Sequence, residues 1–450
     1  MKISPEFLRN SWIEMTPHRM IGMPAILGGI FFLTYLVSEN SLGLAGNAFR
    51  TVGISLFTLL TILWGTKLAS ECVATEIKDN TWDLQRMTSI SPWEMTWGKL
   101  FGSTVFVWYG AVFTLAAYLY GVAGNNPAFV IKNILLLVGA GILSQSVAML
   151  ASMISIRKNR GYTRSTASAS MLLAIIFSAS LLGPGLSNET SYEWYGQYYH
   201  AIDFILLSVF VFCIWSILGI YRLLRSEFQF ANSPLVWILF IFFAAFYSAG
   251  FINSAYASDE EILSARLFVA FGISLISAYL LIFSEQKDPM FIRKLTFLAK
   301  NSQWKLLIQT IPGWLASIFL ATLFGLVLLA RDYPGINLLF KGLEMHPYLI
   351  SAILFAYRDI ALVLYFNLDK KRQRADMTAF IYLAILYFLV PGILGKSGLS
   401  SIAAFFVPFS GSQIYTSITG AGIQFLIVLV LAYRRWKQNF SIVQEVTSNF

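Results

Sequence analysis

The chain has 450 residues, of which 57% are hydrophobic and only 12% are charged, and its mean hydropathy is +0.66. Soluble domains carry about 25% charged residues, so this composition excludes a soluble globular protein and predicts a surface that mostly faces lipid. Two cysteines, Cys72 and Cys213, lie in unrelated contexts, so the sequence suggests neither a disulfide framework nor a thiolate metal site.

Apolar segments long enough to cross a bilayer, which takes about 20 residues each, recur about twelve times along the chain. They lie near residues 20–38, 49–70, 100–121, 129–155, 165–186, 204–223, 235–252, 263–284, 307–330, 347–367, 377–394 and 412–433. The pattern predicts an all-α polytopic membrane protein with two six-helix halves, residues 1–225 and 226–450, divided by a polar break.

Basic residues fall mainly on one side of these spans. With the N-terminus inside, about 25 of the 32 Lys and Arg residues are cytoplasmic, which is the side that carries them in membrane proteins. The inner clusters include 157-RKNRGYTR-164, 222-RLLR-225, 369-DKKRQR-374 and 434-RRWK-437, whereas 258-SDEE-261 and 189-ETSYE-193 lie outside. We therefore expect both termini in the cytoplasm. The net charge of +9 is explained by contact with membrane lipids, without nucleic acid.

The first predicted element is an amphipathic helix over 4-SPEFLRNSWIEM-15. It begins with Ser-Pro-Glu, a helix start, and Phe7, Leu8, Trp12 and Met15 share one face at helical spacing. We expect this helix to lie along the inner membrane interface.

The segment 76-EIKDNTWDLQRMTSISPWEMTWGK-99 is polar, although it connects two predicted spans. Its residues 91-SPWE-94 have the pattern of a capping box, with Ser91 and Glu94 satisfying each other's backbone amides and proline at the first helical position. This pattern predicts a helix that begins at Pro92 and continues through Gly98 and Lys99 into the third span.

A second, shorter helix is predicted just upstream. Asn80 tolerates a positive φ and can stop the preceding helix, and Thr81 can then cap a helix over 82–87 that has Asp83 near its positive end. Such a short helix is unstable alone and needs a partner surface, which is either the membrane interface, with tryptophans as anchors, or another protein.

These features together resemble the first cytoplasmic connection of ABC-2 type permeases, the membrane subunits of ABC exporters. The residues that occupy the motif are Glu76, Asn80, Thr81, Trp82, Asp83, Leu84, Met87, Ser91, Glu94, Gly98 and Lys99. Asn80 stands where the family usually has glycine, and 89-SIS-91 lacks a proline often found there. The resemblance covers residues 1–225 and extends to the second half only by layout, with 285–305 as a degenerate counterpart of the motif.

The resemblance implies that residues 76–94 form a coupling helix region that docks on a separate ABC ATPase subunit. That subunit would bind ATP and Mg²⁺, so the chain would be no enzyme and hold no cofactor of its own. It would export a hydrophobic or amphipathic substrate across a bacterial inner membrane. If only residues 76–99 dock, a homodimer is favoured. The alternatives are an ion-coupled secondary transporter with twelve spans and a membrane-embedded enzyme.

Two further features are candidates for the pathway or its gating. Pro-Gly pairs at Pro184 and Pro391 are predicted to interrupt corresponding spans of the two halves, as in transporters built from repeats, or else to end each span at the interface. Arg358 and Asp359 lie within a span. Neighbours on a helix point about 100° apart, so we expect each to pair with another helix and fix the bundle, or to contact substrate.

No catalytic or metal-binding set is predicted. Residues 395-GKSG-398 lack the earlier glycine of a phosphate-binding loop, because Val390 stands in its place. The three histidines, His18, His200 and His346, lie in different connections. The aromatic stretch 192-YEWYGQYYH-200 is predicted to be an interfacial belt or short re-entrant helices at the outer mouth, with a role in handing a hydrophobic substrate outward as the alternative.

Overall fold

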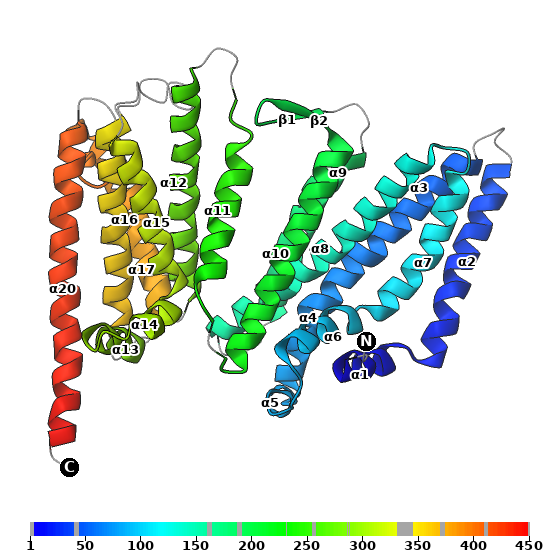
Figure 1. Cartoon of the computed structure of the whole chain (residues 1–450), viewed down its shortest axis with the longest axis horizontal. Helices are drawn as coiled ribbons and strands as arrows, with labels where there is room; N and C mark the ends of the chain where they lie inside the picture. Colours follow the sequence, from blue (N-terminus) through cyan, green and yellow to red (C-terminus); the bar gives the residue numbers. More distant parts are fainter. Residues whose placement is uncertain are drawn as a thin grey trace. The chain divides into compact units, whose positions relative to one another are not determined.

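The fold is almost entirely helical (Figure 1), and the computed structural model describes residues 4–39, 45–159, 164–186, 191–230, 232–253, 258–285, 287, 289–330, 345–369, 374–408 and 413–448. Within these residues, eight helices are long and apolar enough to cross a membrane, and ten if each of two bent helix pairs counts as one span. The chain is therefore an all-α polytopic membrane protein, as predicted.

The remaining two predicted spans are shorter apolar helices, at Ala169–Ser180 and Leu235–Ala249. Twelve spans thus stays a prediction. Parts of two predicted basic clusters, residues 160–163 and 370–373, and residues 189–190 of a predicted outer loop lie outside the described residues.

The chain divides into two compact units. Unit 1 comprises Met1–Tyr192 and Tyr198–Asn232, and unit 2 comprises Glu193–Gln197 and Ser233–Phe450. The helices of unit 1 are α1 (Pro5–Glu14), α2 (Pro17–Glu39), α3 (Ala45–Thr58), the π-helical turn η1 (Leu59–Trp64), α4 (Gly65–Lys78), α5 (Trp82–Arg86), α6 (Pro92–Gly102), α7 (Val105–Gly121), α8 (Pro127–Asn159), α9 (Arg164–Leu186) and α10 (Ala201–Glu227). Those of unit 2 are α11 (Leu235–Ala249), α12 (Asp259–Ser284), α13 (Pro289–Lys300), α14 (Trp304–Thr310), α15 (Gly313–Leu329), α16 (Met345–Asn367), α17 (Ala375–Ala384), the π-helical turn η2 (Ile385–Leu389), α18 (Val390–Lys396), α19 (Ser400–Ala403) and α20 (Ile414–Ser448).

The core of unit 1 surrounds a π-helical turn in the long helix α3–η1–α4. Buried Phe57, Leu137 and Val209 pack here from α3, α8 and α10. Gln145 of α8 donates from Nε2 to the Thr61 carbonyl of the turn, at 3.1 Å, and accepts from Trp108 Nε1 at 3.1 Å. The amide side chain thereby satisfies a carbonyl in the turn, a buried polar group that would be costly to leave unpaired.

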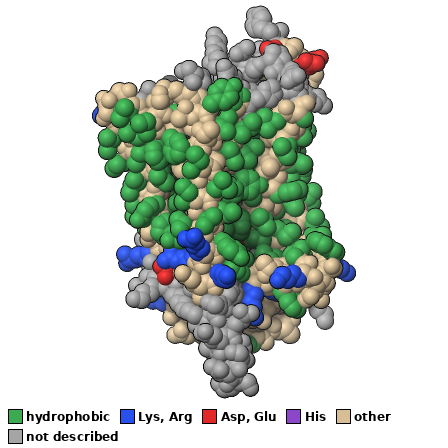
Figure 2. Space-filling model, turned by 90° about the vertical axis from the view of Figure 1, so that its left-hand side faces the viewer, with side chains coloured by type: hydrophobic (Ala, Val, Ile, Leu, Met, Phe, Trp, Pro, Cys, Tyr) green, Lys and Arg blue, Asp and Glu red, His purple; other side chains and the backbone are tan. Residues whose placement is uncertain are grey.

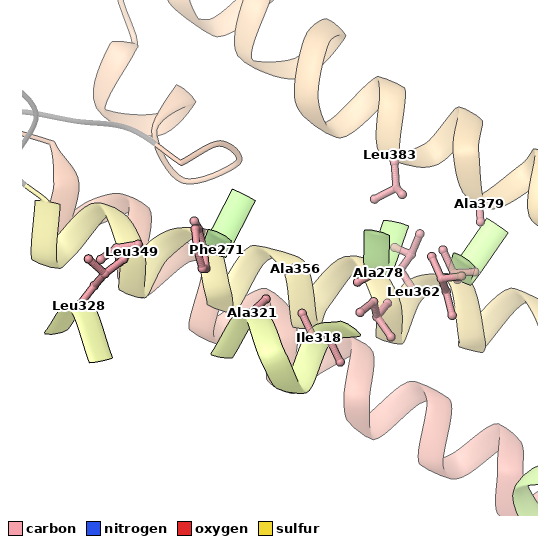
Figure 3. Close-up of a cluster of buried hydrophobic side chains, with 14 of the residues drawn as sticks. Phe271, Ala278, Ile318, Ala321, Leu328, Leu349, Ala356, Leu362, Ala379 and Leu383 are labelled. Carbon is pink, nitrogen blue, oxygen red and sulfur yellow. The ribbon is translucent and has the colours of Figure 1, made fainter. Parts of the chain in front are cut away.

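The core of unit 2 lies between α12, α15, α16 and α17 (Figure 3). Ala278, Ala321, Ala356 and Ala379 are at most 1% exposed and alternate with larger side chains such as Phe271. Small residues let helices approach closely, which is the main source of packing energy where lipid already solvates apolar side chains.

One face of the protein is apolar across its middle (Figure 2). On the face in Figure 2, hydrophobic side chains cover the central band, and Lys and Arg side chains gather toward one end. This is the distribution expected of a membrane protein with its basic residues at one interface.

Two segments that were each predicted to form one continuous helix are bent. The helix that begins at Pro92 does not run straight into the third span, because α6 and α7 meet at 52° across residues 103–104. The span predicted at 307–330 is also broken: α14 and α15 meet at 97° across Ile311 and Pro312. Pro312 precedes the first residue of α15, and proline disfavours helical geometry in the residue before it.

The pair at Pro391 does not stop its helix, which corrects the interruption predicted there, whereas α9 ends two residues after Pro184, so the call at Pro184 stays a prediction. Helix α9 continues to Leu186, and residues Ala375–Lys396 form one candidate span. The helix adapts to Pro391 through the π-helical turn η2 that precedes it. Such a turn accommodates the missing amide without ending the helix.

The aromatic stretch after α9 is a β-hairpin, so the predicted short re-entrant helices are wrong, whereas the alternative of an interfacial belt stays a prediction. Strands β1 (Ser191–Trp194) and β2 (Gln197–His200) are joined by Tyr195 and Gly196, both with positive φ. Two such residues make the tight turn that suits a two-residue hairpin. Within unit 2, Trp194 Nε1 donates to the Tyr247 carbonyl at 3.0 Å, and the Tyr195 hydroxyl donates to the Phe246 carbonyl at 2.9 Å.

Candidate functional site

The short helix α5 is held in place by the way α4 ends. Asn80 has φ of 58°, its amide donates to the Ile77 carbonyl at 3.2 Å, and the Thr81 amide donates to the Glu76 carbonyl at 2.9 Å. These two bonds with a left-handed residue between them form a Schellman motif, in which Asn80 replaces the usual glycine. The predicted stop at Asn80 is confirmed, and it turns the chain sharply into α5.

Thr81 does not cap α5 with its side chain, contrary to prediction. Its hydroxyl donates to the Glu76 carbonyl at 3.2 Å, which strengthens the end of α4. The predicted helix itself is present as Trp82–Arg86, with Asp83 in its first turn. An acidic side chain there is favourable beside the positive end of the helix.

The predicted capping box at the start of α6 is confirmed. The Glu94 amide donates to Ser91 Oγ at 3.2 Å, and the Ser91 amide donates to Glu94 Oε2 at 3.2 Å. Ser4, just before α1, donates from its hydroxyl to the Glu94 carbonyl at 3.1 Å. The first turn of α6 is therefore fixed both by its own cap and by the N-terminal segment.

The two faces of α5 differ in exposure. Trp82 and Gln85 are buried, and Trp82 belongs to a core cluster with Met95, Met149 and Leu224. On the other face the side chain of Asp83 is 86% exposed, Leu84 is 69% exposed and Met87, which follows the helix, is 85% exposed. We call Asp83, Leu84 and Met87 the α5 face. Among the residues of the predicted motif in and beside α5, only those of the α5 face can contact a partner, because Trp82 faces the core.

Beneath α5 lies a buried ionic network centred on Lys99 of α6. Lys99 is inaccessible, and its Nζ donates to Gln85 Oε1 at 2.7 Å and to Glu6 Oε1 at 3.1 Å, and it also pairs with Glu76. Gln85 Nε2 donates in turn to Glu76 Oε1 at 2.8 Å. The ammonium group lies 5.2 Å from the Trp82 ring centroid. One cation thus joins the end of α4, the inner face of α5, α6 and α1.

The N-terminal helix α1 packs on α6 where two glycines leave room. A Cβ on Gly98 would lie 2.7 Å from Glu6 Cβ, and one on Gly102 would lie 2.9 Å from Asn10 Cβ. The helix is present as predicted, but its buried residues are Glu6 and Asn10, while Trp12 is 83% exposed. Leu8 and Trp12 of the predicted apolar face are therefore free to meet lipid, whereas Met15 packs against a core cluster and the polar face docks on the protein.

Arg9 completes the network at its outer edge. It donates to Glu6 Oε1 at 2.9 Å and also pairs with Glu76. Burial lowers the pKa of the guanidinium, but the nearby carboxylates of Glu6 and Glu76 outweigh burial and raise it above its ordinary value. Two cations, Arg9 and Lys99, therefore balance the two carboxylates.

Sequence reasoning identified Glu76 and Lys99 by resemblance but missed Glu6, Arg9 and Gln85. Their partners are far away in the sequence: Glu6 and Lys99 are 93 residues apart. The signal that could have found Glu6 is its spacing with Asn10, which places two polar residues on one side of a helix whose other side is apolar. A further contact ties α5 to α10, because Arg86 Nη2 donates to the Glu227 carbonyl at 3.0 Å.

Arg358 and Asp359 form a second buried network, in unit 2. They pair with each other, with Nη2 and Oδ1 2.6 Å apart, so the expectation that they would not neutralise one another is wrong. Each also reaches a neighbouring helix, as predicted. Arg358 Nη1 donates to Gln424 Oε1 at 2.7 Å, and Asp359 Oδ2 accepts from the hydroxyls of Tyr279, at 2.6 Å, and Tyr387, at 2.7 Å. Both charged side chains are 1% exposed, so this network fixes four helices together.

Of the predicted site residues, the structure groups those of the segment 76–99 around α5 and joins Arg358 to Asp359. Pro391 lies beside η2 and forms part of neither group. Over the ranges that the structure describes, no cluster of three or more His, Cys, Asp or Glu side chains is arranged to hold a metal ion. Comparisons with protein-family models, with curated proteins and with solved structures found no match.

Proposed function

We propose that this chain is the transmembrane subunit of an ATP-driven exporter and that a separate ATPase subunit docks on the α5 face. The single observation that supports the proposal is the contrast between the two sides of α5. Asp83, Leu84 and Met87 are exposed, whereas Trp82 and Gln85 are locked into the bundle. An exposed apolar pair beside a charge is suited to a protein partner, and the locked side is suited to passing on its motion.

The connections of α5 give a physical route for that motion. A helix of five residues has no stability of its own, so it moves with the groups that hold it. Through Gln85 and Lys99 those groups are Glu76, at the end of one candidate span, and α6, which leads by the 52° bend into α7. A push on the α5 face would therefore reach two membrane segments at once.

The remaining features of the proposal follow from the resemblance to ABC-2 type permeases. About twelve spans would form two halves, with both termini in the cytoplasm of a bacterial cell and the chain in its inner membrane. ATP and Mg²⁺ would be bound by the ATPase subunit, and its closure would tilt the halves to open the pathway alternately inward and outward. The cargo would be hydrophobic or amphipathic, in keeping with spans of uniformly apolar sequence.

The proposal predicts that an ABC ATPase is encoded beside this chain, and the test uses the chain purified with that ATPase and reconstituted in lipid vesicles. Leu84→Asp with Met87→Asp should weaken the complex at least tenfold and abolish stimulation of ATP hydrolysis, because two exposed apolar contacts become buried charges. Asp83→Lys should weaken it by reversing the charge of the α5 face.

The matched control is Asp79→Lys, which makes the same charge reversal at an exposed position on the neighbouring end of α4. It should leave the complex intact. If the Leu84→Asp, Met87→Asp chain keeps its partner and full stimulation, or if the chain transports its cargo in vesicles with no ATP hydrolysis, the proposal is wrong.

A further inference from the structure

Helices α13 and α14 connect α12 to α15 and lie together at one end of unit 2 (Figure 1). Helix α14 makes an angle of 97° with α15, a helix of uniformly apolar residues. If α15 crosses the bilayer, α14 must run roughly parallel to the membrane plane at the level where the span begins. That level is the headgroup region, where amphipathic helices lie flat.

The connection is anchored at both of its ends. The Gly313 amide at the start of α15 donates to Glu285 Oε1 at 3.1 Å, and Lys287 pairs with Asp376 at 2.8 Å. Between α13 and α14, Ser302 has φ of 54° and the Gln303 amide donates to the Leu298 carbonyl at 3.0 Å. This ends α13 in the same way as Asn80 ends α4, and it sets the direction of α14.

The charged residues of α13 and α14 have one sign. Residues 289–310 include four basic side chains, Arg293, Lys294, Lys300 and Lys305, and no aspartate or glutamate. All four basic residues are exposed. Helices that are exposed to water usually carry both positive and negative side chains. A helix face with only positive charges is instead suited to binding a negatively charged surface.

Exposed apolar side chains are interleaved with these cations. Phe297 is 61% exposed and shares a helix face with Arg293, four residues before it, and Lys300, three residues after it. Trp304 is 61% exposed beside Lys305, and Leu306 and Ile308 are also exposed. An aromatic ring set between two long basic side chains can enter the acyl boundary while the cations reach the phosphates.

We propose that this α13–α14 surface (Arg293, Lys294, Phe297, Lys300, Trp304 and Lys305) binds anionic phospholipid headgroups in the surrounding leaflet. The positive charge of this surface selects the anionic lipid, and its exposed aromatic rings fix the depth of the two helices in the membrane interface. The binding would hold the start of α15 at a defined level in the membrane. It distinguishes the connection from the α5 region of unit 1, where an acidic residue lies beside the exposed apolar pair. The inference does not depend on the proposed ATPase partner.

The experiment places a fluorophore beside the surface in the full chain. Both native cysteines are buried, so Ala299→Cys adds an exposed thiol that can be labelled selectively. The labelled chain is reconstituted in phosphatidylcholine vesicles that contain about one fifth phosphatidylglycerol, with bromine atoms on the acyl chains of one lipid or the other. Bromine quenches the fluorophore only at close range, so the ratio of quenching reports which lipid is enriched there.

We expect brominated phosphatidylglycerol to quench at least about twofold more per molecule than brominated phosphatidylcholine, and the excess to fall at high salt, which screens exposed charges. Arg293→Gln with Lys300→Gln should remove most of the excess. The matched control is Arg434→Gln with Lys437→Gln, which also removes one arginine and one lysine from exposed positions of unit 2 and should leave the excess unchanged.

Equal quenching by the two lipids in the labelled chain that retains all four basic residues would overturn the proposal. It would also be overturned if neither lipid quenched the fluorophore. Loss of the quenching when an ATPase subunit that binds the chain is added would assign this surface to that protein instead. Because the chain is measured without any ATPase in the first experiment, failure here leaves the role of the α5 face open to its own test.

Discussion

Lys99 and Glu6 pair inside the protein, with Nζ and Oε1 3.1 Å apart and both side chains at most 3% exposed. The pair joins the N-terminal helix to the start of the third predicted span. Since a buried charge is stable only with its partners, the pair makes α1 part of the structure that holds α5.

Replacing Lys99 with methionine should destabilise the protein strongly. The change leaves the carboxylates of Glu6 and Glu76 with only Arg9 to balance them, and loss of one partner from a buried pair costs about 3–5 kcal/mol. The midpoint of thermal unfolding in detergent, measured by tryptophan fluorescence, should be much lower than in the unaltered protein. Lys78→Met, at an exposed position, should change this midpoint little. Adding Glu6→Gln to Lys99→Met should restore part of the loss. A Lys99→Met chain as stable as the unaltered one would contradict the buried network.

Gly98→Ala should loosen α1 from α6. The new Cβ would meet Glu6 Cβ at 2.7 Å and the Phe7 amide nitrogen at 3.0 Å, so the helices must separate at a cost of about 1–3 kcal/mol. Trypsin should then cut after Arg9 faster than in the unaltered protein. Gly28→Ala is the control, because a Cβ at Gly28 meets nothing within 4 Å. Equal cleavage rates for the two variants would rule out the close packing of α1 on α6.

Trp82 and Leu84 should respond differently to truncation although they are neighbours on one short helix. Trp82→Ala removes a buried aromatic side chain and should cost about 3–5 kcal/mol, whereas Leu84→Ala at an exposed position should stay within about 0.5 kcal/mol. Unfolding midpoints of the purified chain alone measure both. If Leu84→Ala proved as destabilising as Trp82→Ala, the α5 face would be part of the core and could not serve as a docking surface.

Arg358→Ala should damage folding more than transport. It leaves Asp359 buried without its cation, which costs about 3–5 kcal/mol, and it frees Gln424 and the ring of Phe355 from their contact with the guanidinium. The yield of folded protein from membranes, measured by size-exclusion chromatography, should fall. The double variant Arg358→Ala, Asp359→Ala removes both charges and should recover part of that yield. Normal yield of Arg358→Ala together with abolished export would show that the pair serves transport instead.

Local signals predicted the parts of the site that depend on neighbours in sequence. The capping box of Ser91 and Glu94 spans four residues, and the stop at Asn80 needs only one residue that tolerates a positive φ. Both were found where the sequence placed them. The side-chain cap by Thr81 was wrong because Thr81 has helical backbone angles, φ −93° and ψ −15°, instead of the extended geometry of a capping residue, and its hydroxyl donates to the Glu76 carbonyl.

Three features that depend on how the backbone or a side chain adapts to its surroundings were predicted less well. The Pro-Gly rule overestimated the effect of Pro391, since a π-helical turn absorbs the missing amide. The hairpin at 191–200 lacks the usual Asn-Gly turn and uses Tyr195 and Gly196, so the sequence did not indicate a hairpin and short helices were predicted instead. The rule that adjacent helical residues point apart failed for Arg358, whose long side chain folds back to Asp359.

The sequence by itself determined the class of protein, the approximate positions of the apolar helices and the caps around α5, because hydropathy and capping depend on short stretches of chain. Only the tertiary structure decided which face of α5 is exposed and which residues hold it. Trp82 and Leu84 have similar hydrophobic character, and nothing local says that one is core and the other surface. That choice is made by Lys99, Glu6 and Glu76, which meet only after α1, α4 and α6 have packed, since buried charges must find partners from distant segments.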